Sequence, residues 1–380
     1  MTAQPPIVND LLIALNYYSP YVSGLTNVAR DVAEGLAARG WRVTVVASQH
    51  APELPLEEHI NGVRVVRTPV ALRIGKGVIS PSFIGTVRRE SARSRLLNLH
   101  APMLEAGLIA RASLAPVVMT YQCDISLPAT LLGRLQNRML DLSTSLAARK
   151  SAFVTVTSDD YADHSRMREA LSRRRRVIPA TCKVRTGGTP VYRDGPGPHI
   201  GFLGRIVEEK GVEYLVEGFR AFDHPAARLL IAGDFQGVAG GSVIDRVRRS
   251  IGDDPRIRLL GFLPNAALDD FYASLDIFAL PSINPFEAFG IVQVEAMMRG
   301  IPVIASDLPG VRQPVLATGM GAIVAPRSSA AVQQALTTLI GADIDRVAGA
   351  ATARSLYAQD ATLDKFAAVF EEAAGPGPAA

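Results

Sequence analysis

The chain has 380 residues, which at about 150 residues per domain is enough for two or three domains with large cores. Its 48% apolar and 20% charged residues are typical of a globular protein, and no stretch reaches the roughly 18 consecutive apolar residues of a membrane span. The apolar run at 11–15 is too short for a signal peptide, so we expect a cytoplasmic protein. The two cysteines, Cys123 and Cys182, are too few for a disulfide framework or a zinc site.

In the first half, apolar strands alternate with amphipathic helices. A strand at 10–15, a loop that contains Gly24, a helix at 26–39 and a strand at 42–47 form one βαβ unit. Further strands are expected at 63–67, 96–99, 117–121 and 153–157. This alternation predicts a mainly parallel sheet covered by helices.

A segment rich in glycine and proline, 183–198, is expected to be a linker. After it, strands are expected at 200–203, 228–232, 257–260, 277–280 and 302–305, and helices at 212–222, 243–251, 266–274, 289–300, 328–339 and 362–373. We therefore predict an α/β fold with two doubly wound, Rossmann-like domains that face a ligand-binding cleft. Residues 1–182 form the first domain, residues 199–360 the second, and residues 361–380 a final helix with a mobile tail.

The net charge of +4 conceals an uneven distribution. Residues 1–178 carry 22 Lys and Arg against 14 Asp and Glu, whereas residues 179–380 carry 18 against 22. The basic residues of the first half include Arg88, Arg89, Arg93, Arg95 and the run 173–176. Such clusters bind anionic lipid or nucleic acid, although a short arginine run is also typical of a solvated helix end. Because no nucleic-acid motif with interleaved aromatic residues is present, we expect no nucleic-acid partner and favour contact with the inner membrane surface.

Two glutamates eight positions apart, Glu287 and Glu295, flank the start of a predicted helix. Glu287 ends a loop after the strand 277–280, and Glu295 lies inside the helix that opens near Phe289 and Gly290. A helix N-terminus carries unpaired backbone N–H groups and a partial positive charge, so it binds phosphate or sugar oxygens well. The two carboxylates can then accept hydrogen bonds from hydroxyl groups at the two ends of a nucleotide-sugar.

A second motif supplies cations. Gly204 and Arg205 end a predicted strand and Lys210 opens the next helix, so both cations are expected at the carboxyl end of that strand. Two fixed cations there can hold a diphosphate and stabilise the negative charge that grows as a nucleoside diphosphate departs. Gly24 would let a ligand approach the backbone closely, although a simple turn glycine explains its position equally well.

Four short motifs together resemble the donor-site signature of one large family. They are Pro281-Ser282, Glu287-Ala288-Phe289-Gly290, Glu295-Ala296 and Gly300-Ile301-Pro302-Val303. The pattern is similar to that of the retaining glycosyltransferases of the family-4 type, which have the GT-B fold. This resemblance implies an enzyme that binds a nucleotide diphosphate sugar, needs neither a metal nor another cofactor, and has a final helix that crosses back onto the first domain.

The resemblance also implies roles for single residues. Arg205, Lys210 and Glu287 would be catalytic, the two cations clamping the diphosphate and Glu287 facing the sugar. The other donor-binding residues would be Gly24, Gly204, Phe289, Gly290, Ile291 and Glu295, of which Glu295 faces the ribose. His100 and Gln122 occupy positions that contact the sugar or the acceptor. Relatives often have His where this chain has Gln122, and an amide can hydrogen-bond a hydroxyl but cannot exchange a proton near neutral pH.

These observations predict a retaining, metal-independent glycosyltransferase whose acceptor is a glycan, a lipid-linked molecule or a small molecule. A nucleotide-sugar 2-epimerase shares the fold, and Gln122 leaves open a degenerate sugar-nucleotide binding protein. The lack of a Gly-x-Gly-x-x-Gly motif between a strand and a helix argues against an NAD-linked dehydrogenase. The acidic pairs Asp159-Asp160 and Asp253-Asp254 are interpreted as a helix cap and a loop rather than as metal ligands.

Overall fold

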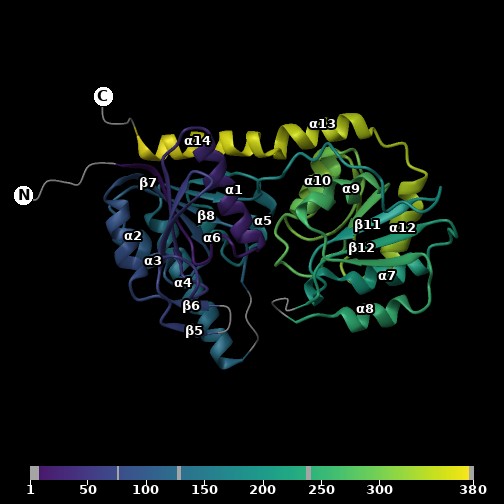
Figure 1. Ribbon diagram of the computed structural model, residues 1–380, viewed down its shortest axis with the longest axis horizontal. Coiled ribbons are helices and arrows are strands. Elements are labelled where there is room, and N and C mark those ends of the chain that lie inside the picture. Colours follow the sequence, from purple (N-terminus) through teal and green to yellow (C-terminus); the bar gives the residue numbers. More distant parts are fainter. Residues whose placement is uncertain (1–7, 75–76, 126–129, 237–240, 376–380) are drawn as a thin grey trace, which may run out of the picture. The chain divides into compact units, whose positions relative to one another are not determined.

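The computed structural model describes residues 8–74, 77–125, 130–236 and 241–375. Internal contacts divide the chain into two units, seen in Figure 1. The first comprises Met1–Thr181 together with Thr362–Ala380, and the second comprises Cys182–Ala361. Among the described residues, no helix is both long and apolar enough to cross a membrane. Residues 376–380, the end of the predicted tail, lie outside the described part of the chain.

The first unit is built on an eight-stranded sheet in the order β10-β9-β8-β7-β1-β2-β4-β3. Neighbouring strands are parallel except β3, which runs antiparallel to β4. The strands are β1 (Asn9–Ala14), β2 (Val43–Ser48), β3 (Glu57–Ile60), β4 (Val63–Thr68), β7 (Ser94–Ala101), β8 (Val117–Tyr121), β9 (Phe153–Val156) and β10 (Arg175–Val177), and a separate hairpin contains β5 (Leu72–Ile74) and β6 (Gly77–Ile79). The central strands are almost wholly buried, as expected for a parallel sheet covered on both faces.

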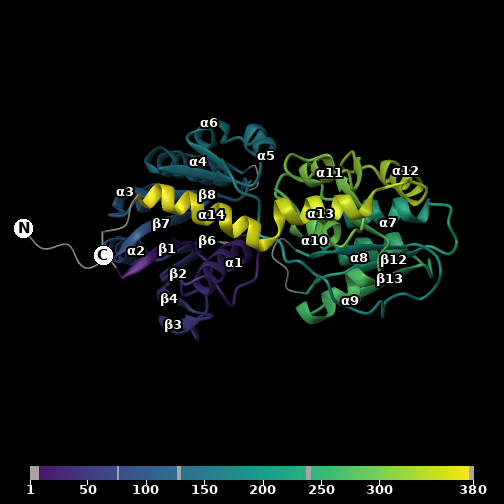
Figure 2. The same ribbon diagram turned by 90° about the horizontal axis from the view of Figure 1, so that it is seen from above.

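Helices cover both faces of this first sheet (Figure 2). The helices are α1 (Gly24–Ala38), α2 (Phe83–Ser91), α3 (Ala106–Ala112), α4 (Leu131–Lys150), α5 (Asp159–His164), α6 (Arg168–Leu171) and α14 (Gln359–Ala374). α1 and α14 share one hydrophobic core with β1, β2 and β4, in which a Cβ added at Gly35 of α1 would lie 2.5 Å from Leu363 of α14. α2 contacts β1, β2 and β7, whereas α3 contacts β7 and α4 contacts β8. The last helix is therefore an integral layer of the first unit.

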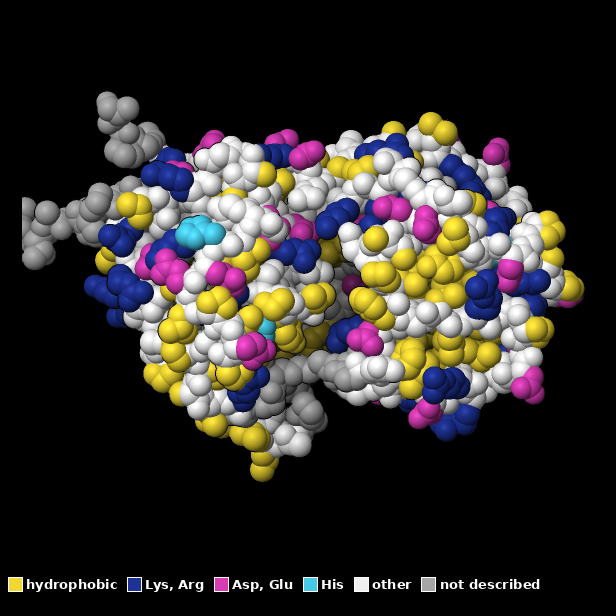
Figure 3. Space-filling model, in the orientation of Figure 1, with side chains coloured by type: hydrophobic (Ala, Val, Ile, Leu, Met, Phe, Trp, Pro, Cys, Tyr) yellow, Lys and Arg dark blue, Asp and Glu magenta, His cyan; other side chains and the backbone are white. Residues whose placement is uncertain are grey.

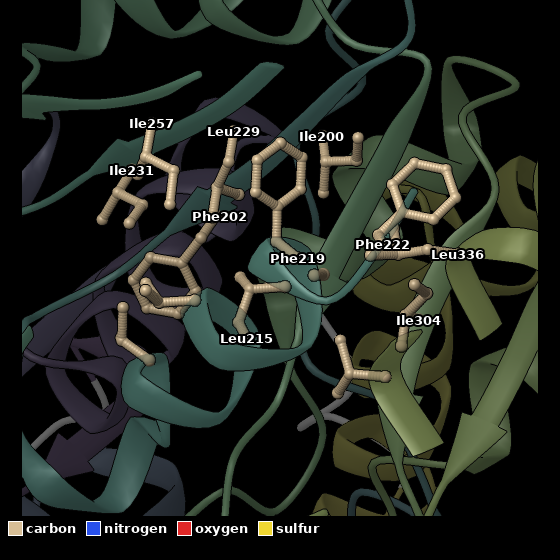
Figure 4. Packing of buried hydrophobic residues seen from close by; sticks show 14 of the residues in the cluster. Ile200, Phe202, Leu215, Phe219, Phe222, Leu229, Ile231, Ile257, Ile304 and Leu336 are labelled. Atoms are coloured by element: carbon tan, nitrogen blue, oxygen red, sulfur yellow. The ribbon is translucent and has the colours of Figure 1, made fainter. Parts of the chain in front are cut away.

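The second unit contains a six-stranded parallel sheet in the order β13-β12-β11-β14-β15-β16. Its strands are β11 (His199–Leu203), β12 (Arg228–Ala232), β13 (Ile257–Gly261), β14 (Ile277–Leu280), β15 (Val303–Ser306) and β16 (Gly321–Val324). Its helices are α7 (Val212–Arg220), α8 (Ile244–Ile251), α9 (Leu268–Ala273), α10 (Ile291–Met298), α11 (Gln313–Thr318), α12 (Ser329–Ile340) and α13 (Arg346–Tyr357). On one face of the sheet, Phe202, Leu229 and Ile231 pack with Leu215 and Phe219 of α7 (Figure 4).

The predicted α/β architecture is confirmed, and the expected strands lie within two residues of their predicted bounds. Two long helices, α4 and α13, were not expected. The helix predicted at 266–274 is a 3-10 turn, η2 (Asn265–Ala267), followed by α9. Alanine, serine and threonine fill much of the buried side of α4, so its apolar periodicity does not mark a face toward the core.

The segment 183–198, expected as a linker, packs on the second unit instead. A Cβ added at Gly188 would lie 2.3 Å from the backbone of Asp269, and one added at Gly197 would lie 2.0 Å from the carbonyl oxygen of Ala226. Arg193 forms an ion pair with Asp276 at 2.9 Å. The glycines here permit close backbone packing rather than freedom of movement.

Candidate functional site

The loops that follow β11 and β14 lie side by side, because these parallel strands are neighbours and end at the same edge of the sheet. The loop after β11 begins at Gly204 and contains the 3-10 helix η1 (Glu208–Lys210), and the loop after β14 spans 281–290. The backbone N–H of Ile283 donates to the carbonyl oxygen of Glu209 at 2.9 Å and so joins the two loops. Side chains carried by the two loops are therefore held close together.

Lys210 and Glu287, 77 positions apart in the sequence, form an ion pair across these loops. The hydroxyl of Ser282 donates to the same Glu287 oxygen at 3.3 Å. The Lys210 side chain is 19% exposed and that of Glu287 is 15% exposed, so both charges are largely shielded but still meet solvent. A cation fixed in this way can meet an anionic ligand without a large reorganisation.

Two glycines shape this edge through backbone geometry. Gly211, directly after Lys210, has a φ of +60°, and a Cβ there would lie 2.3 Å from the carbonyl oxygen of Pro281. Gly290, directly before α10, has a φ of +82°, and a Cβ there would lie 2.4 Å from Leu280. Both positions combine a left-handed backbone with close approach, so only glycine fits without strain.

Arg205, the second predicted cation, lies in the same loop as Lys210 but forms its ion pair with a different carboxylate. Its guanidinium donates to Glu209 at 3.1 Å, and 46% of the side chain is exposed. A Cβ added at the neighbouring Gly204 would lie 3.8 Å from Lys210 Cε, so the lysine side chain passes close to this backbone. The structure thus places both cations after β11, one shielded and one exposed.

Glu295 lies inside α10 and is 5% exposed. Its carboxylate accepts hydrogen bonds from Arg185 Nε at 2.8 Å and from the Tyr272 hydroxyl at 3.2 Å. Burial raises the pKa of Glu295, and the charge of Arg185 opposes that shift. The carboxylate that the resemblance assigns to a ribose is therefore engaged by two buried partners in this structure.

Of the predicted donor-binding residues at the start of α10, Phe289 and Gly290 are buried and Ile291 is half-buried. Phe289 is 5% exposed, and its ring meets that of Tyr357 edge to face with centroids 5.5 Å apart. The buried Gln293 amide donates to the carbonyl oxygens of Phe289 at 2.6 Å and Val311 at 2.9 Å. The Phe289 side chain thus anchors the loop, while Gly290 and the half-buried Ile291 lead into the first turn of the helix.

A second polar cluster lies at the carboxyl ends of β7 and β8 in the first unit. His100 and Gln122 are 5% and 8% exposed, and Gln122 Nε2 lies 2.6 Å from His100 Nδ1 and 3.2 Å from the carbonyl oxygen of Leu25. Burial lowers the pKa of His100 to about 3, so its imidazole is neutral and accepts the amide hydrogen bond at Nδ1. The proton then resides on Nε2, which has no hydrogen-bond partner among the described residues.

The start of α1, close to this cluster, has an ordinary cap. The Ser23 hydroxyl accepts the backbone N–H of Thr26 at 3.2 Å, which satisfies one of the free donors of the first turn. Gly24 is the first helical residue, and a Cβ added there would meet no described atom within 4 Å. Packing within the described residues therefore gives no reason for glycine at this position.

Neither acidic pair singled out in the sequence is part of a carboxylate cluster. Asp159 pairs with Arg175 at 2.9 Å, and Asp254 pairs with Arg256 at 2.7 Å. Over the described ranges, no group of three or more His, Cys, Asp or Glu residues could hold a metal ion.

Two family models match the chain one after the other. A model of the glycosyl transferase 4-like domain covers residues 23–181, and a model of the glycosyl transferases group 1 covers residues 193–354. A GDP-mannose-dependent alpha-mannosyltransferase from Mycolicibacterium smegmatis is 31% identical over 319 residues, which cover 79% of this chain and 80% of that protein. The chain belongs to the family-4 glycosyltransferases. A phosphatidyl-myo-inositol mannosyltransferase from Mycobacterium leprae is 28% identical to this glycosyltransferase over 374 residues, 93% of this chain and 94% of that protein.

Solved structures agree on the fold of the glycosyltransferase. Sucrose-phosphate synthase from Thermosynechococcus elongatus has a TM-score of 0.75 at 20% identity, over 96% of this chain and 98% of that chain. Anabaena HepE in complex with UDP-glucose has a TM-score of 0.71 at 20% identity, over 96% of this chain and all of that chain. The predicted GT-B fold is thereby confirmed.

Three residues that shape the site of the glycosyltransferase were not anticipated: Arg185, Tyr272 and Gln293. Arg185 lies in the presumed linker, and Tyr272 lies in a segment predicted only as a helix. Gln293 lies between the two glutamates, where a polar residue in an otherwise apolar stretch was the only available signal. Their common feature is burial, which single-sequence patterns do not reveal for polar side chains.

Proposed function

We propose that this glycosyltransferase is a retaining hexosyltransferase that uses a nucleoside diphosphate sugar, with GDP-mannose as the first candidate donor. The observation that carries the proposal is the shielded Lys210–Glu287 pair on two adjacent strand ends. In this ion pair, a cation that can bind a phosphate lies directly beside a carboxylate that can bind a sugar hydroxyl. The names of the two mycobacterial relatives, both mannosyltransferases, support mannose as the sugar.

In the proposed complex, Lys210 exchanges its carboxylate partner for a diphosphate oxygen. Glu287, released from the ion pair, accepts a hydrogen bond from a hydroxyl of the donor sugar. Arg205, which is exposed beside Lys210, adds a second cation, and the first turn of α10 adds a partial positive charge. These groups bind most strongly when the leaving diphosphate has gained its full charge, so they lower the barrier to transfer.

We further propose that the acceptor attacks the sugar on the face from which the diphosphate leaves. The bond from the anomeric carbon to the diphosphate breaks, the bond to the acceptor oxygen forms on the same face, and a departing phosphate oxygen takes the acceptor proton. The anomeric configuration is then retained. The protein cations supply the charge that holds the diphosphate, and on that ground we propose that no metal and no other cofactor is required.

For the first unit we propose a role in binding the acceptor or the transferred sugar. His100 Nε2 carries a proton without a described partner, so it can donate a hydrogen bond to a hydroxyl. Gln122 holds the imidazole through Nδ1 and thereby fixes which nitrogen carries that proton. A lipid-linked acceptor is the class that the Mycobacterium leprae relative's name suggests, and contact with the inner membrane surface is part of this proposal.

The test is a donor panel followed by product analysis. GDP-mannose, UDP-glucose, ADP-glucose and a TDP-sugar are compared by thermal shift, since a ligand at a hundred times its Kd adds about 2.7 kcal/mol of stability. The donor that binds is then incubated with and without acceptor, in the presence and absence of EDTA. We expect slow hydrolysis without acceptor, transfer with retained configuration by NMR, and no effect of EDTA. An inverted product, or activity that EDTA abolishes and Mg²⁺ restores, would contradict the mechanism.

The same incubation separates the two other hypotheses. An epimerase would change the sugar of the donor without an acceptor, and none of the relatives named above is an epimerase. A degenerate binding protein would bind the donor and leave it unchanged in every condition. In that case the decisive variant is Gln122→His. Activity in this variant but not in wild type would show that the natural chain has lost its catalytic activity.

A further inference from the structure

One side of α4 carries large apolar side chains that point away from the protein. Leu135, Met139, Leu142 and Leu146 follow at spacings of three or four residues and so share one face of the helix. Their exposed fractions are 56%, 47%, 61% and 45%, and Leu131 and Leu132 at the start of α4 are 86% and 62% exposed. We call these six residues the α4 face.

The buried side of α4 has the opposite character. It consists of small residues: Gly133, Ser143, Thr144, Ala147 and Ala148. An ordinary surface helix packs its large apolar residues inward and presents polar ones to water. The large apolar side chains of α4 therefore add little to the core of the unit, and their position calls for an external apolar contact.

The apolar surface extends to the neighbouring helix α3. Gly107 of α3 donates its N–H to the Ser143 hydroxyl at 2.9 Å, and a Cβ added there would lie 2.9 Å from Leu146 Cβ. The next residue, Leu108, is 60% exposed. Figure 3, which has the orientation of Figure 1, shows apolar side chains at the lower end of the first unit, where α4 begins.

The charges carried by α4 itself are almost all positive. The basic residues of α4 are Arg134, Arg138, Arg149 and Lys150, all exposed. Its one acidic residue, Asp141, is neutralised by Arg166 at 2.9 Å. At the end of the helix, Arg149 and Lys150 join Arg173 and Arg174 around a surface hollow of about 800 Å³. This hollow lies at the start of β8, the edge of the sheet opposite to His100 and Gln122.

We propose that the α4 face docks on an anionic lipid bilayer, with its leucines among the acyl chains and its basic residues at the phosphate headgroups. From 131 to 146 the face measures about 22 Å at 1.5 Å per residue, which suits a helix lying in the plane of the interface. A second copy of the chain is a poorer occupant, because pairing two such faces would bring the rows of Arg134 and Arg138 together, and the one carboxylate of α4, Asp141, is already paired with Arg166. The inference rests on the membrane contact in the proposed function and names the surface that makes it, which is distinct from the arginines of α2. Vesicle binding is measured without donor, so its outcome is separate from that of the transfer assay.

The first test removes the apolar contact. Full-length protein is floated with vesicles of phosphatidylcholine and phosphatidylglycerol, and Leu135→Gln combined with Leu142→Gln is compared with wild type. We expect at least about a tenfold loss of vesicle binding. The matched control is Leu316→Gln with Val347→Gln, which changes two residues of the second unit that are 61% and 83% exposed, and it should bind like wild type. Thermal melting of each variant checks that it is folded.

The second test addresses charge and the competing surfaces. Arg134→Glu with Arg138→Glu should abolish the preference for phosphatidylglycerol over pure phosphatidylcholine, whereas Arg248→Glu with Arg249→Glu on α8 should keep it. Leucine variants that bind as well as wild type would overturn the proposal, as would binding that is lost only in Arg88→Glu with Arg89→Glu. The proposal would also be overturned if wild-type protein sediments as a dimer and binds no vesicles, while the leucine variants sediment as monomers. That result would assign the α4 face to a second copy of the chain.

Discussion

Replacing Lys210 by methionine tests the proposed donor site most directly. The substitution keeps the length of the stem, which passes the backbone at Gly204, and removes only the charge. If Lys210 meets the charge that develops on the leaving diphosphate, its loss costs about 2.7–4 kcal/mol, or about 10²–10³-fold in turnover. Measured single-turnover rates of transfer, or of slow donor hydrolysis, report this loss.

The pairing with Glu287 adds a second, separable effect. Lys210 is the one cation paired with Glu287 among the described residues, so Lys210→Met leaves the carboxylate with only the Ser282 hydroxyl. The uncompensated negative charge should then repel the diphosphate and weaken binding of the free nucleotide. Adding Glu287→Gln removes that repulsion, so the double variant should regain nucleotide affinity in calorimetry but not turnover.

The control is Arg248→Met, which removes an exposed cation of the same unit that pairs with Asp245 of its own helix at 3.6 Å. Its turnover should stay within about twofold of wild type, because it lies outside the proposed site. Lys210→Arg should retain more activity than Lys210→Met. Turnover of Lys210→Met within about twofold of wild type, or a double variant whose affinity does not recover, would refute the assignment of these two residues.

Three further outcomes follow from the contacts around the site. Arg185→Met should lower the free energy of unfolding in urea by about 3–5 kcal/mol, because it leaves the carboxylate of Glu295 buried without a cation. Adding Glu295→Leu should recover most of that loss. A loss below about 1 kcal/mol in the single variant would contradict this expectation. The pKa of His100 is lowered from 6.5 to about 3 in the folded state, so the unfolded chain takes up its proton first and stability falls as pH decreases from 6.5 toward 3. Between pH 7.5 and 5 the shifted pKa should lower the free energy of unfolding by about 2 kcal/mol, and a His100→Asn variant should lack this decrease in urea titrations. The same decrease with pH in both proteins would exclude a shifted His100. Gln122→Ala should lower turnover about three- to tenfold with unchanged free-nucleotide affinity, as expected for one neutral hydrogen bond, and an unaltered rate would remove Gln122 from the site.

The parts of the fold that depend on apolar periodicity could be predicted from the sequence. Parallel strands such as β8, β12 and β14 are short apolar runs bounded by breakers, and they were located to the residue. The tight turns of the candidate donor site could also be expected, because Gly211 and Gly290 stand where predicted helices open. The helix α4 could not be predicted, because it has small residues on its buried side and large apolar residues on its exposed side. This is the inverse of the pattern by which a surface helix is recognised.

Pairings between side chains far apart in sequence could not be predicted. Lys210 and Glu287 were both singled out, but their ion pair follows only from the adjacency of β11 and β14. The engagement of Glu295 by Arg185 depends on the segment 183–198 folding back onto the second unit. The hydrogen bond between His100 and Gln122 likewise depends on the register of β7 with β8, which pairs His100 with Thr120. The motifs therefore singled out candidate residues, and the topology determined which partners those residues have.

The chain leaves the first unit at Thr181 and returns to it at Thr362, and this order constrains how the protein folds during synthesis. Leu363, Phe366 and Phe370 of α14 close the core between α1 and β1, and they leave the ribosome only after the whole second unit. The second unit is continuous in sequence and complete by Ala361, so it can finish folding while the first unit still lacks one layer. A nascent or truncated chain that ends before α14 would expose the apolar side of α1, and chaperones and proteases would then act on the first unit until α14 has packed onto it.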